Sequence, residues 1–92
     1  MLRAGDHVHH GPSGEDWVLA CDERDGHVVP AGWPECMAKA EHCTLLKAAD
    51  DAERLEMLTR AAATRTENGS YSWRKSLAMQ QLAASHAAGA RA

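Results

Sequence analysis

The amino-acid sequence predicts one small α+β domain, in which an SH3-like β-barrel of four or five short antiparallel strands is followed by a C-terminal helical hairpin. Residues 3–48 alternate short apolar runs with turns rich in glycine and proline, a pattern typical of short strands joined by tight turns. From residue 49 onward the apolar residues recur at spacings of three and four, which is the period of a helix. A chain of 92 residues suffices for one domain with a modest core, so residues 3–48 and 49–92 are interpreted as two parts of one unit.

The first hairpin is predicted over residues 5–20, where two strands flank the turn Gly11-Pro12-Ser13-Gly14. The two glycines of this turn accept a positive φ without steric cost, and the proline between them fixes its own φ. The second strand is predicted within residues 16–22, which are apolar on both faces. Trp17 lies in this strand and is therefore expected in the core.

The remaining strands follow two further turn signals. Asp25-Gly26 precedes a short apolar run, which predicts a tight turn and a third strand at Val28 and Val29. Pro34 ends this strand because proline cannot donate a hydrogen bond to the ladder. A last strand is predicted within residues 40–47.

Two helices are predicted after the strands. Asp50 or Asp51 can cap a first helix over roughly residues 50–64, and Ser70 or Ser72 can cap a second helix that should end near Gly89. This helical hairpin is expected either to cover one face of the barrel or to mediate self-association as a homodimer. The residues expected to form the contact are four leucines: Leu55, Leu58, Leu77 and Leu82.

Composition and charge restrict the function. Residues 1–48 hold eight acidic and four basic residues, and the whole chain has a net charge of −3, which disfavours binding to a phosphate backbone. No run approaches the roughly 18 consecutive apolar residues that would predict a transmembrane helix. Three cysteines cannot pair completely, and no apolar leader is evident, so a cytoplasmic protein with reduced thiols is expected.

One set of residues resembles a known group of sequences. The pattern covers residues 5–48 and reads Gly5-Asp6-x-Val8-x-His10-x-Pro12-Ser13-Gly14-Glu15-x-Trp17, then Gly32-Trp33-Pro34-Glu35, then Cys43-x-Leu45. It resembles short uncharacterised proteins from bacterial and phage genomes. Small proteins of mobile elements include inhibitors of host defence, among them anti-CRISPR proteins, which act by occluding a protein surface. The resemblance therefore implies a phage-type protein that binds a protein partner.

The predicted partner-binding site combines an aromatic turn with acidic side chains. Trp33 follows Gly32 and precedes Pro34, and an indole in such a turn can cap the barrel or anchor a bound peptide. The acidic surface would attract a basic partner and could mimic the charge of nucleic acid. The residues predicted for this site are Trp33, Glu35, Asp22, Glu23 and Asp25.

Nucleic-acid binding is the first alternative. Cations alternate with aromatic residues around the turn between the two helices, as they do in sites for single-stranded nucleic acids. The residues of this alternative are Arg60, Arg65, Tyr71, Trp73, Arg74 and Lys75.

Zinc binding and thiol catalysis are the remaining alternatives. The potential zinc ligands are His7, His9, Cys36, His42 and Cys43, but six residues separate the two cysteines, whereas structural zinc sites use closely spaced ligand pairs. His42 and Cys43 would point to opposite faces of a strand, so His42 could not activate the thiol. The sequence therefore predicts no catalytic residues, no metal and no cofactor.

Overall fold

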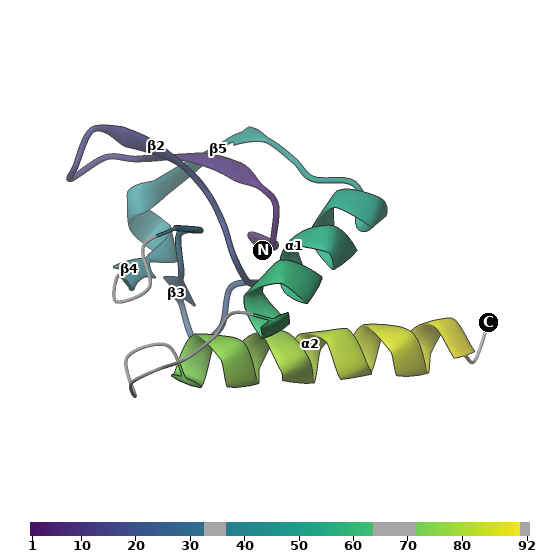
Figure 1. Ribbon diagram of the computed structural model, residues 1–92. Helices are drawn as coiled ribbons and strands as arrows, with labels where there is room; N and C mark the ends of the chain where they lie inside the picture. The colour runs from purple at the N-terminus through teal and green to yellow at the C-terminus, as the bar shows by residue number, and fades with distance from the viewer. Residues whose placement is uncertain (33–36, 64–71, 91–92) are drawn as a thin grey trace.

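The computed structural model describes residues 1–32, 37–63 and 72–90 (Figure 1). Within these residues the chain is an α+β protein, as predicted. Its elements are β1 (His7–His10), β2 (Glu15–Val18), β3 (His27–Val28), β4 (Ala38–Lys39), the short 3₁₀ helix η1 (Ala40–His42), β5 (Cys43–Lys47), α1 (Asp51–Ala63) and α2 (Ser72–Ala90).

The strands form two antiparallel sheets. One sheet has the order β2-β1-β5, and the other pairs β3 with β4. The segment after β2 links the sheets, because Ala20 donates to the carbonyl of Val29 at 2.8 Å and Ala31 donates to the carbonyl of Val18 at 2.7 Å. Pro30 lies in this link, bridged to Leu19, and it has no N–H to give the ladder. Within the described residues the strands form an open pair of sheets instead of the expected barrel.

Helix α1 begins where capping predicts. Asp50 caps α1, since its side chain accepts a hydrogen bond from the backbone N–H of Glu53 at 2.7 Å and the Glu53 side chain accepts one from Asp50 N–H at 3.3 Å. This reciprocal pair is a capping box. Helix α2 starts at Ser72, which is its first helical residue, and the position before it lies outside the described residues. In Figure 1 the two helices lie together below the larger sheet, with the C-terminal part of α2 extending beyond α1.

The core has two parts. One lies between the helices and the strand layer and contains Ala4, Ala20, Cys21, Val29, Leu58, Ala61, Leu77 and Ala78. The other lies under the larger sheet and contains Val8, Trp17, Leu19, Val28 and Ala38, which confirms that Trp17 is a core residue. Because Leu58 and Leu77 are buried within the chain, and Leu82 packs beside them, the helices cover the strand layer. This is the first of the two expected arrangements, and it leaves the buried Leu58 and Leu77 unavailable for self-association.

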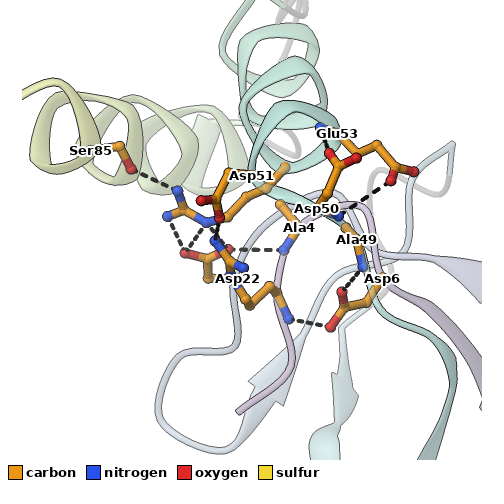
Figure 2. A network of polar contacts seen from close by, with 10 residues as sticks. Ala4, Asp6, Asp22, Ala49, Asp50, Asp51, Glu53 and Ser85 are labelled. Atoms are coloured by element: carbon orange, nitrogen blue, oxygen red, sulfur yellow. Dashed lines mark hydrogen bonds and ion pairs between the residues drawn. The ribbon is translucent and has the colours of Figure 1, made fainter. Parts of the chain in front are cut away.

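The Gly5-Asp6 pair of the sequence pattern positions α1 against the sheet. Gly5 has φ +84°, and a Cβ built on it would lie 3.0 Å from Ala49 Cβ and 3.3 Å from the carbonyl oxygen of Glu53. Asp6 is buried, and its carboxylate accepts hydrogen bonds from the backbone N–H groups of Arg3 and Ala49, both at 2.8 Å (Figure 2). Glycine is required here by both the backbone conformation and the close approach of α1.

Candidate functional site

The candidate site is a hollow between the tip of the β1–β2 hairpin and the segment containing β4 and η1; we call it the hairpin groove. Its volume is about 420 Å³, within the range of about 300–1,000 Å³ found for binding pockets. Figure 1 shows the hairpin tip above β4. The groove is lined by His10, Pro12, Ser13, Glu15, Trp17, Met37, Ala38, Lys39 and His42.

A stacked pair of rings forms one wall of the groove. Trp17 lies opposite Val8 in the β1–β2 register, and His10, two residues after Val8, shares the same face of the sheet because strand side chains alternate. The rings of His10 and Trp17 stack with centroids 4.1 Å apart and an interplanar angle of 16°. The hairpin register thus stacks the half-buried His10 ring on the buried Trp17 indole, and the His10 ring is the more exposed of the two.

Hydrogen bonds within the hairpin fix this stack. The Ser13 hydroxyl lies 2.7 Å from His10 Nδ1 and accepts a hydrogen bond from Glu15 N–H at 3.2 Å. The Glu15 carboxylate in turn accepts a hydrogen bond from Trp17 Nε1 at 3.1 Å. Four side chains of the sequence pattern therefore hold one another, which limits the entropy that would be lost if a partner bound here.

The opposite wall is more exposed. Met37 is 55% exposed, and its flexible thioether can adapt to different partners. The His42 ring lies 6.4 Å from the His10 ring in a tilted arrangement. Lys39 adds a positive charge to this wall, so the groove combines an apolar floor with a few polar groups that can orient a ligand.

The contact between Ser13 and His10 superficially resembles a nucleophile and its base, but its surroundings favour a structural role. An acyl-transfer site needs N–H donors directed at the developing oxyanion. The three amides nearest to Ser13 donate within the turn: Ser13 N–H to His10 Nδ1 at 3.3 Å, Gly14 N–H to the His10 carbonyl at 2.9 Å, and Glu15 N–H to the Ser13 hydroxyl. The Ser13 hydroxyl serves here to order the turn.

Of the predicted partner-binding residues, Trp33 and Glu35 lie outside the described residues. The Glu23 carboxylate accepts a hydrogen bond from Leu2 N–H at 3.2 Å. Asp25 is exposed in a tight turn, with φ 51°. Among the described acidic residues of the predicted site, Asp25 is therefore exposed and Glu23 is half-buried.

Asp22, predicted as part of the acidic binding site, belongs instead to the fold. Its side chain is 17% exposed and pairs with Arg54, while one of its oxygens accepts a hydrogen bond from Ala4 N–H at 2.9 Å (Figure 2). Burial by itself would raise the pKa of Asp22, but the hydrogen bonds from Arg54 and Ala4 outweigh it, so the pKa lies below its usual value. Arg54 also donates to Ser85 at 2.7 Å, which ties the two helices to the strand layer.

The structure also corrects the nucleic-acid alternative. Arg74 is only 5% exposed, because it lies on the α2 face that packs against the core, where its backbone carbonyl accepts a hydrogen bond from the Cys21 thiol at 3.7 Å. Arg60 forms an ion pair with Glu56 at 2.7 Å, and Lys75 is half-buried. Three members lie outside the described side chains: Arg65, Tyr71 and Trp73. A surface patch that includes Arg74 is therefore not formed.

The potential zinc ligands are not assembled in the described part of the chain, where no group of three or more His, Cys, Asp or Glu side chains is arranged to hold a metal ion. His9 Nδ1 lies 2.7 Å from Asp16, and Cys36 lies outside the described residues. The Cys43 thiol donates to the Lys39 carbonyl at 3.8 Å. Burial raises the pKa of the Cys21 thiol to about 11, so this sulfur is protonated at neutral pH and unsuited to bind metal or act as a nucleophile.

Comparison with known proteins gives no relative: no family model, curated protein or solved structure matches the chain. Among the described helices, none has the length and apolar character needed to cross a bilayer.

The sequence singled out the hairpin residues of the groove only as parts of a turn and a strand, and His42 only as a potential zinc ligand. The signal in the sequence was a series of side chains that can form hydrogen bonds, spaced two or three residues apart: His10, Ser13, Glu15 and Trp17. Side chains two or three residues apart across a tight hairpin can bond one another. The contribution of Met37 and His42 had no such local signal.

Proposed function

We propose that this protein is a non-catalytic protein-interaction module and that the hairpin groove is its contact surface. The observation that carries the proposal is the stacked His10–Trp17 pair, which Ser13 and Glu15 hold in place beside the exposed Met37. Aromatic side chains with little freedom left to lose are favoured at the centres of protein interfaces. A partner side chain that contacts both the half-buried His10 ring and the exposed Met37 would bury surface on both.

The size and polarity of the groove favour a peptide segment of a partner. A volume of about 420 Å³ accommodates a few side chains. Lys39 and Glu15 lie at the same site with opposite charges, so they can fix the orientation of a bound segment without a strong preference for net charge. Glu23 and Asp25 lie outside the groove lining and would add long-range attraction to a basic partner, acting mainly on the association rate.

Three further expectations from the sequence are kept as parts of this proposal. The short strands joined by tight turns support an open relative of SH3-like barrels. The thiols of Cys21 and Cys43 are unpaired, which fits a reducing cytoplasm. The resemblance over residues 5–48 includes five residues that line the groove, His10, Pro12, Ser13, Glu15 and Trp17, and this supports an inhibitor that acts by covering a partner's surface.

Two exposed methionines allow a matched test. Met37 in the groove is 55% exposed and Met79 on α2 is 54% exposed, so replacing either with serine removes a similar exposed side chain. Peptides would be selected on the immobilised full chain from a random displayed library, and their dissociation constants would be measured by calorimetry. We expect Met37→Ser to weaken binding about 10-fold, equivalent to about 1.4 kcal/mol, and Met79→Ser to leave it unchanged.

The proposal fails if no peptide is selected, or if the selected peptides are insensitive to Met37→Ser. A salt-dependent affinity for single-stranded DNA that exceeds peptide affinity would instead support the nucleic-acid alternative.

A further inference from the structure

Strand β5 is an edge strand with two exposed leucines. It pairs only with β1 in the β2-β1-β5 sheet, and in Figure 1 it runs from η1 to the loop before α1. Leu45 is 47% exposed and Leu46 is 54% exposed. An apolar edge strand with unpaired backbone groups is a template for another strand.

The register shows which backbone groups of β5 face outward. Gly11 N–H donates to the His42 carbonyl at 3.0 Å, and the same ladder pairs His9 with Thr44 and Val8 with Leu45. Bonded and non-bonded pairs alternate along an antiparallel ladder. The backbone N–H and C=O of Thr44 therefore face β1, whereas the backbone N–H and C=O of Leu45 face away from it. No residue in the described part of the chain hydrogen-bonds to these two groups.

The Leu45 side chain lies at an open border of the core. It is opposite Val8, which is fully buried under the sheet, so Leu45 points to the core face. Leu46 is the extra residue where the register shifts between His7 and Val8, and it is also exposed. An added strand would cover Leu45 and extend the core beyond β5.

We propose that the occupant of this edge is a second copy of the chain, with two β5 strands pairing antiparallel about a two-fold axis at Leu45. This register joins each outward N–H of Leu45 to the outward C=O of the other Leu45, and it places the two side chains together. Thr44 then faces Leu46 of the second copy, and Lys47 faces the uncharged Cys43. No like charges face each other, as a stable cross-strand arrangement requires.

The other edge of the sheet is less suited to receive β5. The Val18 carbonyl of β2 already accepts a hydrogen bond from Ala31 N–H at 2.7 Å. β2 also begins with the exposed acidic residues Glu15 and Asp16. Pairing of β5 with β2 would be heterologous and would leave further edges open, whereas pairing of β5 with itself closes as a dimer.

The test is a charge-swap experiment on the full chain, monitored by sedimentation equilibrium from about 20 μM to about 1 mM. Concentrations this high are needed because a short strand pair buries less than about 1,200 Å² and associates weakly. We expect the wild-type mean mass to rise toward that of a dimer. Leu45→Glu and Leu45→Lys should each remain monomeric, since the axis opposes like charges, and an equimolar mixture of the two variants should dimerise. Met79→Glu, at a similarly exposed site on α2, should dimerise like the wild type.

Hydrogen exchange gives an independent readout at the same two concentrations. The Leu45 amide should exchange at least about 5-fold more slowly at the higher concentration, while the Thr44 amide, already bonded to β1, should not change. A constant monomer mass up to 1 mM would overturn the proposal. So would dimerisation of the separate Leu45 variants, or failure of their mixture to dimerise while circular dichroism shows both to be folded.

Discussion

Removal of the Arg54 guanidinium should be among the most destabilising single changes outside the apolar core. This group donates to both carboxylate oxygens of Asp22 and to the Ser85 hydroxyl. Asp22 also accepts from Ala4 N–H, and its backbone N–H and C=O bond to the Gln81 amide at 2.9 and 3.2 Å. The N-terminal segment, the segment after β2 and both helices thus meet at the Asp22–Arg54 ion pair (Figure 2).

The magnitude follows from the exposure of this pair. Loss of one partner costs about 3–5 kcal/mol in a buried pair and about 0.2–1 kcal/mol in an exposed one. The side chains of Arg54 and Asp22 are 14% and 17% exposed, which is near the buried limit. We expect Arg54→Ala to reduce the free energy of unfolding at pH 7 by about 2–4 kcal/mol, or to lower Tm by about 10–25 °C in a domain of this size.

The assay is guanidinium unfolding followed by circular dichroism, with Arg60→Ala as the control. Arg60 forms an ion pair with Glu56 one helical turn away, but both side chains are more than 60% exposed. This control should cost no more than about 0.5 kcal/mol. An Asp22→Asn variant and the Arg54→Ala, Asp22→Asn double variant complete a cycle that isolates the coupling between the two side chains.

The same pair sets a pH dependence. The pKa of Asp22 is lowered in the folded protein. As the pH falls past the unfolded pKa of about 3.9, Asp22 is therefore protonated in the unfolded chain before it is protonated in the folded protein. The stability from this carboxylate is therefore complete above that pH and is lost as pH falls through the folded pKa. The difference between wild type and Asp22→Asn should shrink in that acidic range. If Arg54→Ala costs no more than Arg60→Ala at pH 7, the reasoning on this network is refuted.

Two further predictions test the backbone and the buried thiol. Gly5→Ala should reduce the free energy of unfolding by about 2–4 kcal/mol, because Gly5 combines a positive φ with a close approach of α1. The control Gly14→Ala, at a position with φ +71° and no atom within 4 Å of the added Cβ, should cost about 1 kcal/mol. Equal losses of stability in thermal melts would show that the close approach of α1 adds no cost at Gly5. With Cys36 and Cys43 replaced by serine, Cys21 should react with a thiol reagent at pH 8 only at the rate of unfolding, because the folded protein buries its side chain completely. Rapid labelling of the folded protein would show that this thiol is accessible.

Local sequence determined the elements whose signals act over a few residues. Gly14 and Gly26 adopt the positive φ that their turns require, Asp50 caps α1, and Trp17 is buried as its apolar strand predicted. Each of these features depends on a backbone conformation or a pattern within a single segment, which propensity and periodicity describe directly.

Tertiary structure decided the roles of residues whose partners are distant in sequence. Asp22 and Arg54 are 32 residues apart, and neither side chain alone distinguishes a solvated charge from a buried ion pair. The sequence placed Arg74 in a potential nucleic-acid site, but the packing of α2 buries it. The hairpin groove brings the β1–β2 tip next to Met37 and His42. Strand β5 is an edge strand because no described strand pairs with its outer side. Burial and pairing of this kind arise only when separate segments come together, because a charge or an exposed strand has no fixed role until its neighbours are in place.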